Sequence, residues 1–274
     1  MKIARHALTL WRLSTQLVLC NPLCLILQCI AGSSSVPAKT QPDHGLGPLG
    51  LPIFDGQHTP QNIAAHAYLI GVLHGVGLVL GLYSENYRGL GFFLNALAMF
   101  HILEYLMTAM YGNEVKISSF LLNNGREYQF AMIAGVIEYF VWGWLYPPMN
   151  IFRWWNYLAI LLLLASQSLR SAAMCTAGAN FTHLVADEKE THHTLVTSGV
   201  YSIFRHPSYT AFYYWALGTQ LVASNPFSAL AFALTLSRFF RSRIRYEEYT
   251  LLNFFGDRYG EYMGRTGVWI PGWK

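Results

Sequence analysis

Long apolar runs alternate with short polar segments along this chain, and that pattern predicts helices that cross a membrane. A helix needs about 20 apolar residues to span the hydrocarbon core of a bilayer. An open sheet edge cannot satisfy its hydrogen bonds in lipid, so strands are not expected. We therefore predict an all-α fold, a polytopic integral membrane helix bundle with about six to seven spans. The candidate runs are residues 8–30, 64–83, 90–110, 128–145, 154–174, 209–224 and 227–240.

The last two runs predict a C-terminal helical hairpin. No charged residue lies within 210–236, and the Asn225-Pro226 pair is typical of a turn. A hairpin returns both of its ends to the same side of the membrane. The polar blocks 199–209 and 238–248, which flank the hairpin, should then form one water-facing site.

The composition supports a membrane protein. The 274 residues are 53% hydrophobic and only 12% charged, whereas a typical soluble domain is about 25% charged. The net charge of +4 comes from Lys and Arg beside apolar segments. That placement is typical of juxtamembrane charge and not of a nucleic-acid-binding face, so no nucleic-acid partner is expected. The four cysteines have no spacing that suggests a disulfide framework or a zinc site.

Positive charge also predicts the orientation of the chain in the membrane. The tail after residue 236 carries a cluster of arginines, which favours the cytoplasmic side. The polar loop 175–207 should lie on the same side, because the hairpin returns the chain there. We therefore expect a cytosolic loop and tail that together bind the ligand or cofactor.

Residues 1–60 form an N-terminal part that differs from the rest. Segment 8–30 is apolar, and residues 31–60 are a linker rich in Gly, Pro and Ser. If 8–30 is a span, the basic residues at its start face away from the cytoplasm, against their usual preference. The segment is therefore either a signal or targeting sequence, removed after Ala31, or a true first span. Residues 61–274 are expected to form one membrane domain.

The first polar block has the residue types of a ligand site. Gly199 permits a tight bend, and Pro207 can begin a helix. The free N–H groups of a helix start suit a carboxylate or phosphate. Tyr201, His206 and Tyr209 add hydrogen bonds and flat rings. The alternative is a membrane-interface segment with an aromatic belt and no ligand.

The second block contains Arg243 and Glu247, four residues apart and hence on one helical face. One interpretation is an ordinary surface ion pair. The other is a binding pair, in which Arg243 holds an anionic group and Glu247 holds a cationic or hydroxyl-bearing one. A ligand with both a carboxylate and an ammonium group would suit that second arrangement.

Several ionisable residues lie inside the predicted spans, where such residues are candidates for function. His101 and Glu104 are near neighbours on one helix, and a structural pair between them is an equal alternative. Glu138 has no evident partner, and Arg170 could extend its side chain to the interface. A loop rich in His and acidic residues matches no known zinc spacing, so we expect no metal. That loop contains His183, Asp187, Glu188, His192 and His193.

From about residue 100 to 271, the sequence resembles the isoprenylcysteine carboxyl methyltransferase family, the protein-S-isoprenylcysteine O-methyltransferases of the endoplasmic reticulum. The pattern from RHPSY to EE is shared more widely, with phospholipid methyltransferases and sterol reductases. The HTLVTSGVY and AGANF stretches are much more specific. The segments that carry the resemblance are FHILEYLMTA (100–109), LRSAAMCTAGANF (169–181), HTLVTSGVYSIFRHPSY (193–209), RFFRSRIRYEE (238–248) and FFGDRYGEY (254–262).

The resemblance implies an S-adenosylmethionine-dependent enzyme that methylates the C-terminal carboxylate of prenylated cysteine. Arg243 would bind the substrate, and Glu247 would lie on the cofactor side; both are candidate catalytic residues. Two family positions differ here, where Ala186 replaces a glutamine and Gln167 a glutamate. The implied cofactor-binding residues are His193, Thr194, Leu195, Val196, Tyr201, His206, Pro207, Ser208, Tyr209 and Glu247.

The implied partners are proteins with farnesylated or geranylgeranylated cysteine at the C-terminus, such as small GTPases, together with membrane lipid. The implied location is the endoplasmic reticulum membrane, with a multi-pass chain and an active site facing the cytosol. The residues themselves leave other functions open. These are a phospholipid methyltransferase, an NADPH-dependent sterol reductase, and a transporter that performs no chemistry.

Overall fold

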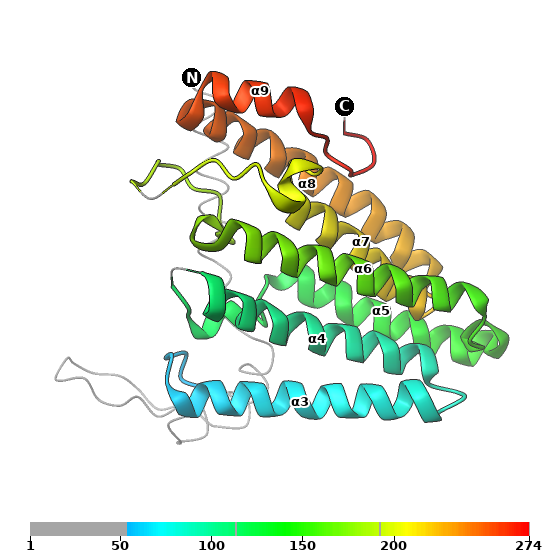
Figure 1. Ribbon diagram of the computed structural model, residues 1–274. Coiled ribbons are helices and arrows are strands. Elements are labelled where there is room, and N and C mark those ends of the chain that lie inside the picture. Colours follow the sequence, from blue (N-terminus) through cyan, green and yellow to red (C-terminus); the bar gives the residue numbers. More distant parts are fainter. Residues whose placement is uncertain (1–53, 113, 192, 274) are drawn as a thin grey trace, which may run out of the picture.

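The described part of the chain is a bundle of long helices that run roughly side by side (Figure 1). The computed structural model describes residues 54–112, 114–191 and 193–273, and the predicted apolar segment 8–30 lies outside them. Within these ranges there are helices and one isolated parallel bridge, Phe204 to Gly267, but no strand. The helices are α3 (Pro60–Tyr83), α4 (Arg88–Tyr111), α5 (Arg126–Leu145), α6 (Trp154–Ala177), α7 (Pro207–Val222), α8 (Pro226–Phe255) and α9 (Asp257–Arg265), with short 3-10 turns between them.

The predicted all-helical fold is confirmed for the described residues, whereas the predicted number of spans is not. Three helices are long and apolar enough to cross a membrane: α3, α4 and α6 with its 3-10 extension to Asn180. Helix α5 carries Arg126, Glu127 and Glu138. The hairpin α7–α8 begins and ends in polar sequence. The count of six to seven therefore stays a prediction.

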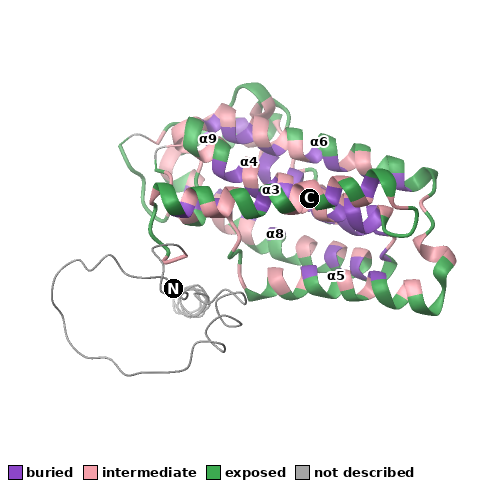
Figure 2. Ribbon diagram, turned by 90° about the horizontal axis from the view of Figure 1, so that it is seen from below, coloured by how far each residue is buried: buried purple, intermediate pink, exposed green. Residues whose placement is uncertain are grey.

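Helices α3 and α4 pack closely because glycines face each other across the contact. An added Cβ on Gly91 would lie 2.2 Å from the backbone nitrogen of Gly81, and one on Gly77 would lie 2.7 Å from that of Asn95. Small residues of this kind let two helices approach within a membrane. The opposite face of α3 is exposed and apolar (Figure 2), as expected of a lipid-facing surface. It includes Tyr68, Leu69, Val72, Val76 and Val79.

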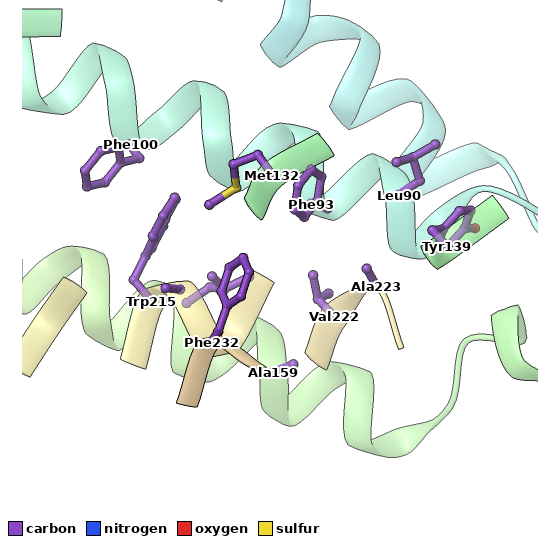
Figure 3. Close-up of a cluster of buried hydrophobic side chains, with 12 residues drawn as sticks. Leu90, Phe93, Phe100, Met132, Tyr139, Ala159, Trp215, Val222, Ala223 and Phe232 are labelled. Carbon is purple, nitrogen blue, oxygen red and sulfur yellow. The ribbon is translucent and has the colours of Figure 1, made fainter. Parts of the chain in front are cut away.

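A hydrophobic core rich in aromatic side chains joins α4, α5, α6, α7 and α8 (Figure 3). Phe100 of α4 stacks on Trp215 of α7 at a ring distance of 4.4 Å. Phe232 brings α8 into the same cluster. At the end of the bundle far from the polar blocks, Asn156 of α6 donates to the carbonyl of Val222 (3.1 Å). These contacts fix α7 against the rest of the bundle.

The turn of the hairpin is held by α5. The Asn225 amide donates to the carbonyl of Gly135 at 2.7 Å. The Glu138 carboxylate accepts from the backbone N–H groups of Phe227 (2.9 Å) and Ser228 (2.7 Å). Glu138, which has no partner evident in the sequence, therefore caps the first turn of α8, where a negative charge is favourable.

Helix α8 continues well beyond the apolar run 227–240 and ends at Phe255. No Gly or Pro interrupts residues 227–255, so the charged part extends the helix without a break. After α9, the chain returns across the base of α7. Arg205 N donates to the carbonyl of Gly267 (2.9 Å), and Ile270 packs against Phe240 and Ile244.

Candidate functional site

The hairpin brings the two polar blocks into contact at one end of the bundle. The Arg243 Nε of α8 donates to the hydroxyl of Tyr209 in α7 at 2.9 Å. One turn further along α8, Glu247 Oε2 lies 3.6 Å from His206 Nδ1. Residues 34 and 41 positions apart thus meet because α7 and α8 are antiparallel and the turn is short.

A cavity of about 180 Å³ lies where these blocks meet. Its wall is formed by the start of α7, the C-terminal half of α8, α9 and the loop that follows α6. Nine of the ten cofactor-binding residues expected from the sequence line it; they are Thr194, Leu195, Val196, Tyr201, His206, Pro207, Ser208, Tyr209 and Glu247. His193 lines a neighbouring cavity of about 90 Å³, which also contains Thr194 and Glu247.

Glu247 lines the cavity, and one of its carboxylate oxygens is buried. Its Oε2 atom is shielded from solvent and forms no hydrogen bond with any described residue. A buried acceptor of this kind is costly unless a partner arrives. The atom is therefore suited to a cationic or hydrogen-bond-donating ligand. The Arg243–Glu247 surface ion pair, one of the two interpretations from the sequence, does not form among the described residues.

Arg243 lies beside the cavity and not in its wall. Its Nη2 donates to the backbone carbonyl of His183 at 2.6 Å, and its Nε donates to Tyr209. Its guanidinium carbon lies 5.2 Å from the centre of the Tyr209 ring. Both hydrogen-bond acceptors are neutral, so the positive charge remains available for an anionic group. The guanidinium is also held in place before any ligand binds.

Tyrosine hydroxyls below the cavity are kept in their neutral form. Burial, reinforced by the nearby Glu247 carboxylate, raises the pKa of Tyr201. Burial also raises the pKa of Tyr262 to about 12. Tyr262 can therefore donate its hydroxyl proton, and it does so to the carbonyl of Tyr201 at 2.7 Å. This bond ties α9 to the turn that precedes α7.

Arg205 and Glu248 form a buried ion pair beside the cavity. Arg205 Nε donates to Glu248 Oε1 at 2.5 Å, and its Nη1 donates to the carbonyls of Met263 and Thr266, both at 2.9 Å. His206 Nε2 lies 3.3 Å from the same carboxylate oxygen. Arg205 therefore joins α8, α9 and the start of α7, which are three walls of the cavity.

Glu104, Arg170 and His183, each singled out in the sequence, form a buried charged cluster that the sequence did not predict. Glu104 of α4 is fully buried and pairs with Arg170 of α6, with Nε to Oε1 at 2.5 Å. It also contacts His183 Nε2 at 2.9 Å. The structural pair between His101 and Glu104, one of the two alternatives from the sequence, does not form, because the His101 ring bonds instead to the carbonyl of Phe120. Glu104 and Arg170 are 66 residues apart, so no local spacing could reveal them as partners.

The loop after α6 covers the cavity and is attached to α8. The Thr194 N–H donates to the side-chain oxygen of Asn180 at 2.7 Å. Tyr246 donates to Asp187 at 2.5 Å, and Lys189 donates to the carbonyl of Phe254 at 2.9 Å. These bonds hold residues 193–200, which belong to the HTLVTSGVY stretch, over the cavity.

Two further expectations concern this loop and α6. Within the described ranges, no three His, Cys, Asp or Glu side chains come together in a way that could hold a metal ion. His192 lies outside those ranges. Both amide atoms of Gln167, the residue that departs from the family pattern, are buried without a hydrogen-bond partner among the described residues.

Comparisons with known proteins point to one family. Residues 158–253 match the Isoprenylcysteine carboxyl methyltransferase (ICMT) family. The Protein-S-isoprenylcysteine O-methyltransferase of Xenopus laevis is 40% identical over 210 residues, which cover 76% of this chain and 73% of that protein. The protein of the same name from Saccharomyces cerevisiae is 42% identical over 214 residues, 75% of this chain and 88% of its own length.

A solved structure agrees with these relatives. It is described as the eukaryotic intramembrane Ras methyltransferase ICMT without a monobody. It superposes with a TM-score of 0.75 at 36% sequence identity, and the match covers 77% of this chain and 76% of that one. At this level of identity the likeness extends beyond the general arrangement of helices.

Proposed function

Because this chain belongs to the isoprenylcysteine carboxyl methyltransferase family, we propose that the cavity between α7 and α8 binds S-adenosylmethionine and that Arg243 holds the acceptor carboxylate. The chain is a multi-pass membrane enzyme that methylates the C-terminal carboxylate of prenylated cysteine. The observation that carries the residue assignment is the contact between Arg243 and Tyr209, with Glu247 one turn away. It places a cation whose hydrogen-bond acceptors are neutral, and a carboxylate whose Oε2 atom has only His206 Nδ1 at 3.6 Å, beside one cavity.

The residues around the cavity fit S-adenosylmethionine, which carries an ammonium group, a carboxylate and a sulfonium. Glu247 Oε2 is a buried acceptor without a hydrogen-bond partner among the described residues, and it suits the ammonium group. The first turn of α7, at Pro207 and Ser208, offers backbone N–H groups to a carboxylate. The Tyr209 and His206 rings, stacked at 5.5 Å, give flat faces beside the same space.

The remaining residues that the sequence predicts as cofactor-binding complete the proposed set. His193 and Thr194 line the side cavity together with Glu247, while Leu195 and Val196 line the main one. Tyr201 closes the wall next to α9. None of these residues has to act as a general base, because the acceptor carboxylate has no proton to lose.

When bound, S-adenosylmethionine would supply an electrophilic methyl group attached to a positively charged sulfur. The acceptor carboxylate is already ionised at neutral pH. The protein therefore has to align this oxygen with the methyl group, and alignment alone can lower a barrier by several kcal/mol. Arg243 is suited to that task because its Nε and Nη2 atoms are fixed by Tyr209 and by the His183 carbonyl. Tyr209 lies between the two proposed binding regions.

The acceptor would approach from the bilayer and the methyl donor from water. Each CH₂ group of a buried prenyl chain contributes about 0.8 kcal/mol, so the lipid can dominate acceptor affinity. We propose that proteins with farnesylated or geranylgeranylated cysteine, small GTPases among them, are the substrates. The arginine-rich tail favours a cytosol-facing site in the endoplasmic reticulum membrane. Residues 61–274 would form the methyltransferase domain, with 1–60 as a separate N-terminal part.

The test is methyl transfer from labelled S-adenosylmethionine to a panel of acceptors by the purified full-length chain in nanodiscs. We expect transfer to N-acetyl-S-farnesylcysteine and not to phosphatidylethanolamine. Arg243→Ala should lower kcat/KM for the prenylcysteine at least 100-fold, because a desolvated guanidinium–carboxylate contact is lost. Binding of S-adenosylmethionine, measured by calorimetry, should change less than threefold.

Arg245→Ala is the matched control, because Arg245 is an exposed arginine on the same helix. It should keep the parental kinetics. If Arg243→Ala retained activity, the assigned role would be wrong. Transfer to phospholipid, NADPH-dependent reduction of a sterol, or transport without modification would each point to one of the alternative functions.

A further inference from the structure

Glu104 is a charged residue in the interior of a membrane helix, and the proposed chemistry does not use it. Its side chain has 0% exposure. A buried carboxylate is costly and persists only when its hydrogen bonds are satisfied. Glu104 meets this condition through two different residues, Arg170 and His183. These lead to opposite sides of the proposed active site.

The first connection runs to the methyl-donor side. Arg170 forms a two-point contact with Glu104, through Nε to Oε1 at 2.5 Å and Nη2 to Oε2 at 2.8 Å. Its remaining Nη1 donates to the Ser208 hydroxyl at 2.7 Å and lies 3.3 Å from the Ser208 carbonyl. Ser208 lines the cavity in the first turn of α7. Glu104 therefore holds the orientation of the arginine that fixes this turn.

The rings of Phe100 and Phe212 further restrict Arg170. Its guanidinium carbon lies 5.4 Å from the centre of the first ring and 5.7 Å from that of the second. A planar guanidinium held by rings and by a forked carboxylate has little rotational freedom. The position of Ser208 is then set by α4 and α6 together, and not by the local helix alone.

The second connection runs to the methyl-acceptor side. His183 Nε2 lies 2.9 Å from Glu104 Oε2, and the carboxylate, which is ionised beside Arg170, accepts this bond. The backbone carbonyl of the same histidine accepts from Arg243 Nη2 at 2.6 Å. Holding the His183 ring therefore holds the carbonyl that orients Arg243. The loop around His183 has no helix of its own to fix it.

We propose that Glu104 is a positioning residue that sets the donor-side and acceptor-side groups relative to each other. It acts through Arg170 on Ser208, and through His183 on Arg243. This inference rests on the proposed roles of Ser208 and Arg243. Oε1 accepts from Arg170 Nε, and Oε2 accepts from both Arg170 Nη2 and His183 Nε2. An amide replaces one of these oxygens with an NH₂ donor, which cannot accept from either partner, and it removes the negative charge that Arg170 faces. Glu104→Gln should therefore keep the size of the side chain but change the position of Ser208 relative to Arg243.

The experiment is two-substrate kinetics on the full-length chain in nanodiscs, with S-adenosylmethionine and N-acetyl-S-farnesylcysteine. We expect Glu104→Gln to lower kcat at least 10-fold when both substrates saturate. Calorimetric affinity for S-adenosylmethionine alone should change less than threefold. Glu104→Asp, which keeps the charge on a shorter side chain, should recover part of the lost kcat. A role in folding alone would lower the folded fraction and leave kcat per folded molecule unchanged, and that result overturns the inference.

His183→Phe tests the acceptor connection separately, since it removes the ring nitrogen and keeps the backbone carbonyl. If each single variant lowers kcat 10-fold, the double variant with Glu104→Gln should lose closer to 10-fold than 100-fold, because both break one connection. Full multiplication of the two effects would overturn this part of the inference. Should Glu104→Gln fail to fold, Glu104→Asp and His183→Phe still decide the question by the same comparison.

Glu138→Gln is the matched control, because Glu138 is another acidic residue on a bundle helix with several hydrogen-bond partners. It lies near the start of α8, about 30 Å from Glu247 by the rise of 1.5 Å per residue. We expect kcat per folded molecule to stay at the parental value. Failure of the proposed function looks different, since then the parental chain would not methylate the prenylcysteine or Arg243→Ala would leave transfer intact.

Discussion

Gly91→Ala tests whether the contact between α3 and α4 is as close as the structure indicates. The new Cβ would lie 2.2 Å from Gly81 N, 2.6 Å from Leu80 C and 2.7 Å from Gly81 Cα, whereas real Cβ atoms almost never come within 3.0 Å of another atom. All three of these are backbone atoms, so no side chain can rotate away. The two helices would have to separate by roughly 1 Å over this contact.

The size of the effect follows from two opposing terms. Overpacking costs about 1–3 kcal/mol, and we take about 3 kcal/mol because the obstacle is backbone. Replacing Gly by Ala inside a helix returns about 1 kcal/mol. The free energy of unfolding should therefore fall by about 2 kcal/mol. For a chain of this size, 1 kcal/mol shifts Tm by about 2–4 °C, so Tm should fall by about 4–8 °C.

Thermal unfolding in detergent, followed by intrinsic fluorescence, measures this shift. Gly75→Ala is the control on α3, because its Cβ would meet no atom within 4 Å. That variant gains the helix propensity of alanine without a steric clash, so it should unfold at or above the parental Tm. A Gly91→Ala protein as stable as the parent, or a Gly75→Ala protein destabilised to the same degree, would refute the reasoning.

Two further predictions concern the cap of α8 and the wall of the cavity. Glu138→Gln removes one of the two oxygens that accept from Phe227 N and Ser228 N. It should lower the free energy of unfolding by about 1–3 kcal/mol, measured by the same thermal assay. Unchanged kinetics would show that the effect is confined to the start of α8. Arg205→Lys should weaken S-adenosylmethionine binding roughly 10-fold in calorimetry, because a lysine cannot bridge Glu248 and the Met263 and Thr266 carbonyls together; unaltered affinity would contradict this role.

The positions of the helices were largely predictable, because the length of each apolar run decides them. The run 90–110 corresponds to α4 (Arg88–Tyr111), and 154–174 corresponds to α6 (Trp154–Ala177). The end of α8 was not predictable from the length of the apolar run, since residues 241–255 mix charged and apolar residues but contain nothing that breaks a helix. Helix continuation there depends on backbone propensity and on packing against α9, not on apolar length.

The candidate site was predictable as far as its two sequence blocks. Turn chemistry at Asn225-Pro226 was enough to bring Tyr209 and Arg243 together. The buried network around Glu104 was not predictable, because its partners come from separate helices and a loop. Neither periodicity nor spacing records which helices are neighbours in the bundle. The pairing with His101, which does not form, shows that nearness on one helix is a poor guide to a partner in lipid.

The length of α8 has a mechanical consequence. The bond from Asn225 to Gly135 restrains one end of this uninterrupted rod, and Arg243 and Glu247 lie near the other. Over a lever arm of about 30 Å, a tilt of one degree displaces the far end by roughly 0.5 Å. Bilayers of different thickness change the tilt of the helices they contain. Turnover in this enzyme should therefore vary with the acyl-chain length of the surrounding lipid, even when no lipid contacts the reacting atoms.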